Sequence, residues 1–456
     1  MQRTYEIRWR RWARVGLTIG ALIFGALASS AVTIAAARDN AQGQADVQGQ
    51  ADVGESLRKH GIGQFKFDAQ IVSAWNSLAH EIAYGEDQFL TFKGQRALAM
   101  MHLAIHDALN TILPLYQRYA YFGSHRAAHP FAAVSQAAYD VLVSQYPDQR
   151  QRVDAELAFW MNQVPNSKHK QRGSEIGAAS ASAILKRRLD DGWNSPREYS
   201  FRSSPGAYQT TPPWDGFVAQ PGFRFARPFA LVKPSQFRPP PPPSLSGTTY
   251  AHAFREVKDY GALVSAQRSA QQTAYAVWWM EFAEGSVNRL ARQLTNDREM
   301  PLWPTARLFA YLNMGFYDGY IATWDAKYEY NHWRPYTAIR EADTDNNSET
   351  TADATWEPLR PTPPFPEYVS AHATACAAAM QILAATFGDD MPFVMQTLTA
   401  PPEMPTRSFE TFTTAADECA DSRVRLGWHF RYSTDAGLSL GRGIARYIMR
   451  AYLQRK

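Results

Sequence analysis

The spacing of apolar residues predicts helices along most of the chain from residue 67 onwards. Over residues 71–82 and 98–112, apolar side chains recur three and four positions apart, which places them on one face of a helix. Similar spacing of apolar residues predicts further helices over residues 131–146, 150–163, 172–190, 250–259, 267–295, 302–325, 366–387, 407–431 and 434–453. The alternation typical of strands is scarce. The pattern therefore predicts an all-α fold.

One long segment, residues 191–248, interrupts the helical pattern. It is rich in Pro, Gly, Trp and Ser and ends in the run Pro239–Pro243, which favours a polyproline conformation. A loop of this length is usually functional or connects two halves. We expect a stiff connector between two packed helix bundles. The predicted halves are residues 61–248, which include the connector, and residues 249–456.

The first 37 residues have the pattern of an export signal. Five arginines lie within residues 1–14, and residues 15–37 carry no charge and end in three alanines. This pattern predicts a signal peptide over residues 1–37, although 23 uncharged residues could also form an N-terminal membrane anchor. Residues 38–60, which contain a tandem polar hexapeptide, are expected to form a flexible linker. The expected location is periplasmic or secreted, with membrane contact only through the N-terminal segment.

Composition narrows the class of protein. A chain of 456 residues with 45% hydrophobic and 20% charged residues is globular, so wholesale disorder is excluded. The formal charge of +4 is too small to indicate nucleic-acid binding. Cys376 and Cys419 are too few for a disulfide scaffold or a cysteine-built zinc site. The two cysteines could pair in an exported protein, but we expect two buried thiols.

Reactive side chains concentrate in three clusters, which are residues 324–335, 363–374 and 422–435. The second cluster follows a Pro-rich loop and opens an apolar helix, so it places a hydroxyl, backbone amides and an imidazole at a helix N-terminus that favours anions. Together the clusters would form a cationic pocket for a tetrahedral or trigonal-bipyramidal oxyanion. The residues that would build this pocket are Lys327, Arg334, Ser370, Ala371, His372, Arg423 and His429.

The spacing of these residues resembles a known signature. The series Lys327-x6-Arg334-Pro335, Ser370-Ala371-His372 and Ser422-Arg423-x3-Gly427-x-His429 is similar to that of the vanadium-dependent haloperoxidases. Those enzymes share their fold and pocket with the type 2 phosphatidic acid phosphatases. The resemblance implies a helical domain of this type in the C-terminal half, carrying the oxyanion pocket.

The resemblance also implies a vanadate cofactor and a role for each residue. His429 would bind the vanadium, and His372 would act as acid and base. Lys327 would polarise bound peroxide and is the third residue expected to be catalytic. Further charge balance and hydrogen bonds to the vanadate oxygens are expected from Lys327, Arg334, Arg423, Ser370 and the amide of Ala371.

The reaction implied by the resemblance is halide oxidation. Hydrogen peroxide would oxidise bromide or chloride to hypohalous acid, with vanadium acting as a Lewis acid. Trp324 and Phe365, placed as in the fungal chloroperoxidases, would form the halide side of the pocket. Aromatic residues at helical spacing are often core residues, so this role competes with simple packing. Halide preference, organic substrate and oligomeric state are not indicated.

Two other functions remain open. The same pocket would suit an exported acid phosphatase that forms a phosphohistidine at His429, or a protein that only binds phosphate or vanadate. Three departures from the family pattern bear on the choice. Ala371 replaces a glycine, and Ser433 stands where many members have an aspartate that steadies the imidazole. The acidic partner of the motif arginine is not assigned, with Glu281 and Glu284 as candidates.

A second histidine pair lies far from the three clusters. His102 and His106, four residues apart and beside Asp107, have the spacing of a metal-binding pair on a helix. A third ligand is not evident in the sequence. We therefore expect core or surface histidines at these two positions.

Overall fold

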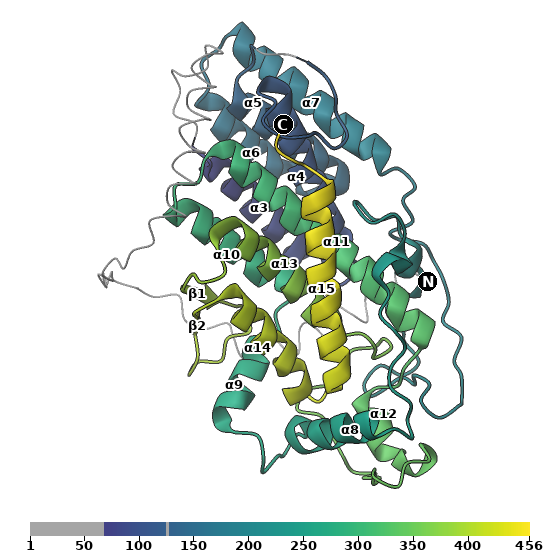
Figure 1. Ribbon diagram of the computed structural model, residues 1–456. Coiled ribbons are helices and arrows are strands. Elements are labelled where there is room, and N and C mark those ends of the chain that lie inside the picture. Colours follow the sequence, from purple (N-terminus) through teal and green to yellow (C-terminus); the bar gives the residue numbers. More distant parts are fainter. Residues whose placement is uncertain (1–67, 125–126) are drawn as a thin grey trace.

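The computed structural model describes residues 68–124 and 127–456 (Figure 1). The predicted signal and linker, residues 1–37 and 38–60, lie outside these ranges. Helices dominate the described residues, which confirms the all-α fold; the sheet found there is a small antiparallel pair of β1 (Phe393–Gln396) and β2 (Thr406–Phe409). Within the same ranges, helices that are both long and apolar enough to cross a membrane are not found.

The first helices of the described chain form one bundle, drawn in purple to blue in Figure 1. The central helix α4 is buried along nearly its whole length, and α7 packs closely on α5 because glycines line the contact. A Cβ at Gly177 would lie 2.5 Å from the carbonyl oxygen of Ala133. The helices are α3 (Gln70–Asp87), α4 (Lys93–Ile112), α5 (Pro130–Gln145), α6 (Arg150–Asn162) and α7 (Lys168–Arg187).

The C-terminal helices form a second bundle. Close contact between α13 and α15 again depends on a glycine, because a Cβ at Gly441 would lie 2.2 Å from the carbonyl oxygen of Thr374. The long helix α11 contacts α4 on one side and α13 and α15 on the other, so one apolar core runs through both bundles. The helices are α10 (Ala283–Asp297), α11 (Leu302–Tyr330), α13 (Ala371–Phe387), α14 (Phe412–Arg425) and α15 (Arg431–Ala451).

Short helices close the end of the second bundle that lies farthest from α5 and α7 (Figure 1). Here a smaller apolar cluster, which includes Tyr250, Trp333 and Phe430, packs beneath the loops that carry the reactive residues. The short helices are α8 (Thr248–Gly261), α9 (Ala270–Trp278) and α12 (Pro335–Arg340). The 3₁₀ turns are η1 (Pro147–Gln149), η2 (Pro221–Phe225), η3 (Pro234–Phe237) and η4 (Ala342–Thr344).

Three predicted helices were wrong in their bounds. Residues 267–295 form two helices, because the capping box at Ser269 starts α9 and the extended backbone of Phe282 starts α10. Residues 406–409 pair as β2, and the helix begins only at Phe412, after its cap. The helix predicted over 366–387 begins at residue 371, because Ser370 caps it.

The connector between the halves lies against the loops that carry the reactive residues. The amide of Ala219 donates to the carbonyl of Pro364 (2.8 Å), and the amide of Tyr208 donates to the carbonyl of Asn331 (2.9 Å). These backbone bonds hold the connector beside the ends of α11 and the Pro-rich loop before α13. The exact division of the chain at residues 248 and 249 stays a prediction.

Candidate active site

The last turn of α11 places Lys327 inside the protein. Its side chain is fully buried, and its Nζ donates to the backbone carbonyls of Pro366 and Glu367, both at 2.9 Å. Burial, followed by the charge of Arg334, holds the pKa of Lys327 well below its ordinary value. The first cluster is thereby tied to the loop that precedes the second.

Arg334 joins all three clusters from its position at the start of α12. Its Nε donates to the carbonyl of Phe365 and its Nη1 to the carbonyl of Trp428, each at 2.8 Å, and Nη1 lies 3.2 Å from Nε2 of His429. The remaining nitrogen, Nη2, is buried and has no hydrogen-bond partner among the described residues. Burial lowers the pKa of Arg334 to about 10. One donor of a buried guanidinium is therefore free for a bound group.

The start of α13 carries the second cluster. The Ser370 hydroxyl accepts a hydrogen bond from the amide of Ala373 (3.4 Å) and caps the helix. Ala371 is the first helical residue and does not have a positive φ, so the alanine that replaces glycine here costs no backbone strain. Nε2 of His372 is buried without a hydrogen-bond partner in the described chain, and burial, then the charge of Arg423, lowers the pKa of His372 well below its ordinary value.

Arg423 lies buried in the last turn of α14. It donates from Nη2 to the carbonyl of Trp279 (2.7 Å) and from Nε to the hydroxyl of Ser422 (3.0 Å), and burial lowers its pKa to about 9. The two candidates for its acidic partner are engaged elsewhere. Glu281 pairs with Arg289 at 2.8 Å, and Glu284 accepts a hydrogen bond from the Tyr320 hydroxyl at 2.7 Å.

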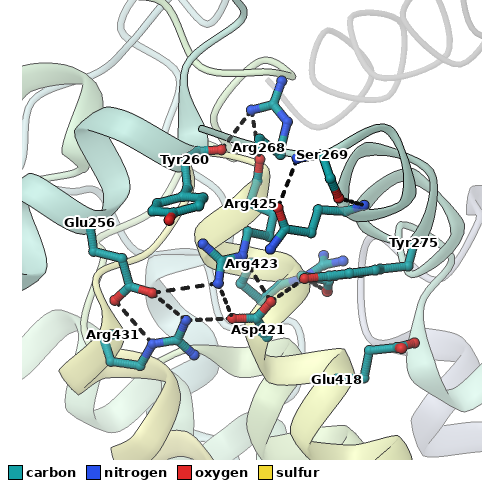
Figure 2. Close-up of polar contacts among 12 residues, drawn as sticks. Glu256, Tyr260, Arg268, Ser269, Tyr275, Glu418, Asp421, Arg423, Arg425 and Arg431 are labelled. Carbon is teal, nitrogen blue, oxygen red and sulfur yellow. Dashed lines mark hydrogen bonds and ion pairs between the residues drawn. The ribbon is translucent and has the colours of Figure 1, made fainter. Parts of the chain in front are cut away.

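A tight turn between α14 and α15 presents His429. Gly427 has a φ of 77°, and a Cβ there would lie 2.6 Å from the carbonyl oxygen of Gly261, so only glycine fits. Figure 2 shows an ionic network that fixes the helices on both sides of this turn. Its members are Glu256 on α8, Asp421 and Arg425 on α14, and Arg431 on α15.

The imidazole of His429 is where the three clusters meet. Burial lowers its pKa well below the ordinary value, and four nearby cationic or protonatable groups lower it further. In decreasing order of effect these are Arg334, Lys327, Arg423 and His372. The structure therefore brings together the predicted residues, from segments about a hundred residues apart.

Aromatic residues form one wall beside this group. The rings of Trp324 and Phe365 lie 4.9 Å apart, and the Phe365 ring centre is 5.0 Å from Nζ of Lys327 and 4.9 Å from Cζ of Arg334. Trp324 also packs against Phe92 of the first bundle at 4.7 Å. Trp324 is thus both a core residue and a neighbour of the cationic group.

Comparison with known proteins identifies this arrangement. Residues 307–455 match the family described as the VCPO second helical-bundle domain. The vanadium chloroperoxidase of Curvularia inaequalis is 28% identical over 144 residues, a stretch that covers 27% of this chain and only 24% of that relative. The resemblance to the vanadium haloperoxidases is confirmed.

Two solved structures show the same fold. A structure described as the first bacterial vanadium-dependent iodoperoxidase has a TM-score of 0.74 and 23% identity, and the match covers 86% of this chain and 98% of the other. A holo-type bacterial vanadium-dependent chloroperoxidase has a TM-score of 0.64 and 19% identity, covering 79% and 91%. At these identities the likeness concerns the haloperoxidase fold.

One residue of the site was missed by sequence reasoning. Glu367 is fully buried, and its Oε1 lies 2.8 Å from Nδ1 of His429 and accepts the amide of Phe430 at 3.0 Å. Burial raises the pKa of Glu367 to about 7, against the opposing charges of Lys327 and Arg334. The signal in the sequence was an acidic residue inside the otherwise apolar Pro-rich loop, three positions before Ser370.

The charges of this site are not balanced by the protein. Within the described chain, Lys327, Arg334 and Arg423 are buried around His429 with Glu367 as the buried carboxylate beside them. Burying unpaired cations is costly unless a counter-charge is present. The unpartnered donor of Arg334 and the excess of cations fit an oxyanion with several oxygens, such as vanadate or phosphate.

The expectation of two free thiols was wrong. Cys376 and Cys419 form a disulfide, with their Cα atoms 6.7 Å apart. The sulfurs meet because α13 and α14 pack side by side, which the sequence alone does not reveal. The bond joins the helix that starts with Ser370 to the helix that carries Arg423.

The distant histidine pair is part of the core, as expected. His102 contacts the Asn76 amide through Nε2 at 2.9 Å, and His106 contacts the carbonyl of Gln117 through Nε2 at 3.0 Å. Asp107 accepts hydrogen bonds from three backbone amides, those of residues 119–121. Each of these three residues thus has a protein partner, although Nδ1 of His102 is buried without one in the described chain.

Proposed function

We propose that the chain is a vanadate-dependent haloperoxidase that uses hydrogen peroxide to oxidise a halide, bromide or chloride, to hypohalous acid. The observation that carries this proposal is the group of buried cations around His429, with an unpartnered donor on Arg334 and an unpartnered ring nitrogen on His372. The aromatic wall of Trp324 and Phe365 beside those cations favours the oxidative branch of the superfamily. The curated relative is itself a chloroperoxidase.

Each residue of the site would have a role that follows from the chemistry of its side chain. Bound vanadate would supply Lewis-acid activation of hydrogen peroxide without a change of oxidation state. Lys327, Arg334 and Arg423 would offset the negative charge of the oxyanion, and Nε2 of His429 would face it. Nε2 of His372, neutral because burial lowers the pKa of this histidine, would accept the proton of the incoming peroxide and return it to the leaving oxygen.

The second candidate is a phosphatase that uses the same groups. A phosphoryl group has the size and charge of vanadate, and an imidazole with a free Nε2 can attack phosphorus. The third is a protein that binds phosphate or vanadate without turning anything over. All three candidate functions use the same residues, so activity measurements are needed to distinguish them.

Activity assays on the full-length protein separate the three candidates. Halogenation of a phenolic dye is measured with orthovanadate, hydrogen peroxide and bromide, chloride or iodide; hydrolysis of p-nitrophenyl phosphate is measured without vanadate. We expect halogenation that requires vanadate, is lost in His429→Ala and is kept in His252→Ala, an exposed histidine on α8. Hydrolysis alone would instead identify a phosphatase, and tight binding without either activity would identify a binding protein.

We also propose that the protein is exported. This rests on the basic and uncharged segments at the N-terminus. N-terminal sequencing of the product from the periplasm or medium is expected to show cleavage after residue 37. Retention of the complete N-terminus in the membrane fraction would favour an anchor, and recovery of all the protein in the cytoplasm would contradict export.

A further inference from the structure

Two side chains lie beside Nδ1 of His429. The hydroxyl of Ser433, four residues further along the chain, lies 3.4 Å from this nitrogen, which is a long contact. A carboxylate reaches the same nitrogen from another segment. Oε1 of Glu367 lies 2.8 Å from Nδ1.

We propose that Glu367 is the positioning residue of the site. Its carboxylate holds a proton on Nδ1 of His429 and turns Nε2 of that ring toward the bound oxyanion. The inference rests on the proposed function only in that His429 is the residue that meets the oxyanion.

Two independent neighbours require the same tautomer of His429. The Glu367 oxygen that faces Nδ1 also accepts the amide of Phe430 at 3.0 Å, so it acts as an acceptor and Nδ1 must donate. Arg334 has only donors, so Nε2, at 3.2 Å from its Nη1, must accept. A ring with a proton on Nδ1 and a lone pair on Nε2 satisfies both contacts.

Glu367 is itself held rigidly, as a positioning residue must be. Its side chain is fully buried, its amide donates to the carbonyl of His332 at 2.9 Å, and its own carbonyl accepts from Nζ of Lys327 at 2.9 Å. Through the Phe430 amide its carboxylate also holds the turn that presents His429. One residue therefore connects the anion-binding lysine to the orientation of the imidazole.

The competing interpretation is that Glu367 only offsets the buried positive charge. That role would require a carboxylate near Lys327 and Arg334 but no particular state of the imidazole. The two interpretations differ in the state of the imidazole, because loss of a mere counter-charge would leave the tautomer of His429 unchanged and would not weaken anion binding. The hydroxyl of Ser433 lies 3.4 Å from Nδ1, so an aspartate at position 433 would reach that nitrogen whether or not Glu367 is present.

The test uses the full-length variants Glu367→Gln, Glu367→Ala and Glu367→Ala/Ser433→Asp, with Glu341→Gln, an exposed glutamate at the end of α12, as matched control. Orthovanadate and inorganic phosphate affinities are measured by calorimetry. The tautomer of His429 is read from ¹⁵N-histidine spectra of vanadate-free protein, with His429→Gln identifying the signal. Because Gln keeps the shape of the glutamate, it tests the proposal even if the alanine variant does not fold.

We expect Glu367→Ala to weaken vanadate binding about 10- to 100-fold and to reduce the Nδ1-protonated form. Glu367→Gln should show the same changes in smaller measure, and Ser433→Asp should restore most of the affinity and the tautomer. Folded Glu367 variants with normal affinity and tautomer would overturn the proposal, as would weak binding that Ser433→Asp does not rescue. A protein whose affinity and tautomer respond as expected but that never halogenates would contradict the proposed function and leave this inference standing.

Discussion

Replacing Arg334 by glutamine provides a quantitative test of the anion site. Its Nη2 is buried without a hydrogen-bond partner in the described residues, so it is the donor most available to an oxyanion. A hydrogen bond between charged groups contributes about 1.5–3 kcal/mol, and each 1.4 kcal/mol changes a binding constant tenfold. Loss of this donor is therefore expected to weaken binding about 10- to 150-fold.

The same substitution has two opposing effects on the free protein. The carbonyls of Phe365 and Trp428 lose their donors, which is destabilising, while Lys327 loses a like-charged neighbour, which is stabilising. We expect these effects to offset each other in part. The change in Tm without anion should thus be small compared with the loss of the anion-induced rise in Tm.

Calorimetric titration with micromolar orthovanadate, and with phosphate as a redox-inert surrogate, measures the effect directly. Arg340→Gln is the matched control, since Arg340 lies on the same short helix and pairs with the exposed Glu357. The control should bind as the unaltered protein does. If Arg334→Gln binds vanadate and phosphate with unchanged affinity while folded, the placement of the oxyanion beside this guanidinium is refuted.

Three further predictions concern stability and the turn that carries the imidazole. Burial raises the pKa of Glu284 to about 7 from 4.5. As the pH rises from 4.5 to 7, the free energy of unfolding in urea should therefore fall relative to that of Glu284→Gln, by on the order of 3 kcal/mol. Equal pH dependence of this free energy in the two proteins would contradict the prediction. Replacing Cys376 and Cys419 by alanine removes a link between residues 43 apart and should lower the free energy of unfolding by about 2–4 kcal/mol, whereas equal unfolding midpoints would show that the link adds nothing. Gly427→Ala should cost at least about 2 kcal/mol, because its φ is 77° and a Cβ would lie 2.6 Å from a backbone carbonyl. Gly443→Ala, within α15, is the control and should be tolerated, so equal losses in both glycine variants would argue against the strain.

The sequence was sufficient for the fold class and for the residues that the structure brings together around His429. Helical periodicity depends only on local spacing, and Lys327, Arg334, Arg423 and His429 stand at family spacing along the chain. Helix bounds were less predictable where the local spacing of apolar residues favoured a helix but contacts with a remote segment favoured another structure. Residues 407–409 were predicted to be helical, but they belong to a strand that pairs with residues 393–396, a contact that no local pattern encodes.

What the tertiary structure alone decided is how the site is held in place. Glu367 reaches His429 across 62 positions of sequence, and Cys376 meets Cys419 across 43, because α13 and α14 pack together and the Pro-rich loop folds beneath the turn. Side-chain chemistry and spacing are properties of the chain itself, so the sequence already indicated an oxyanion site. Which carboxylate orients the imidazole depends on the distance between segments remote in sequence, and only packing determines that distance.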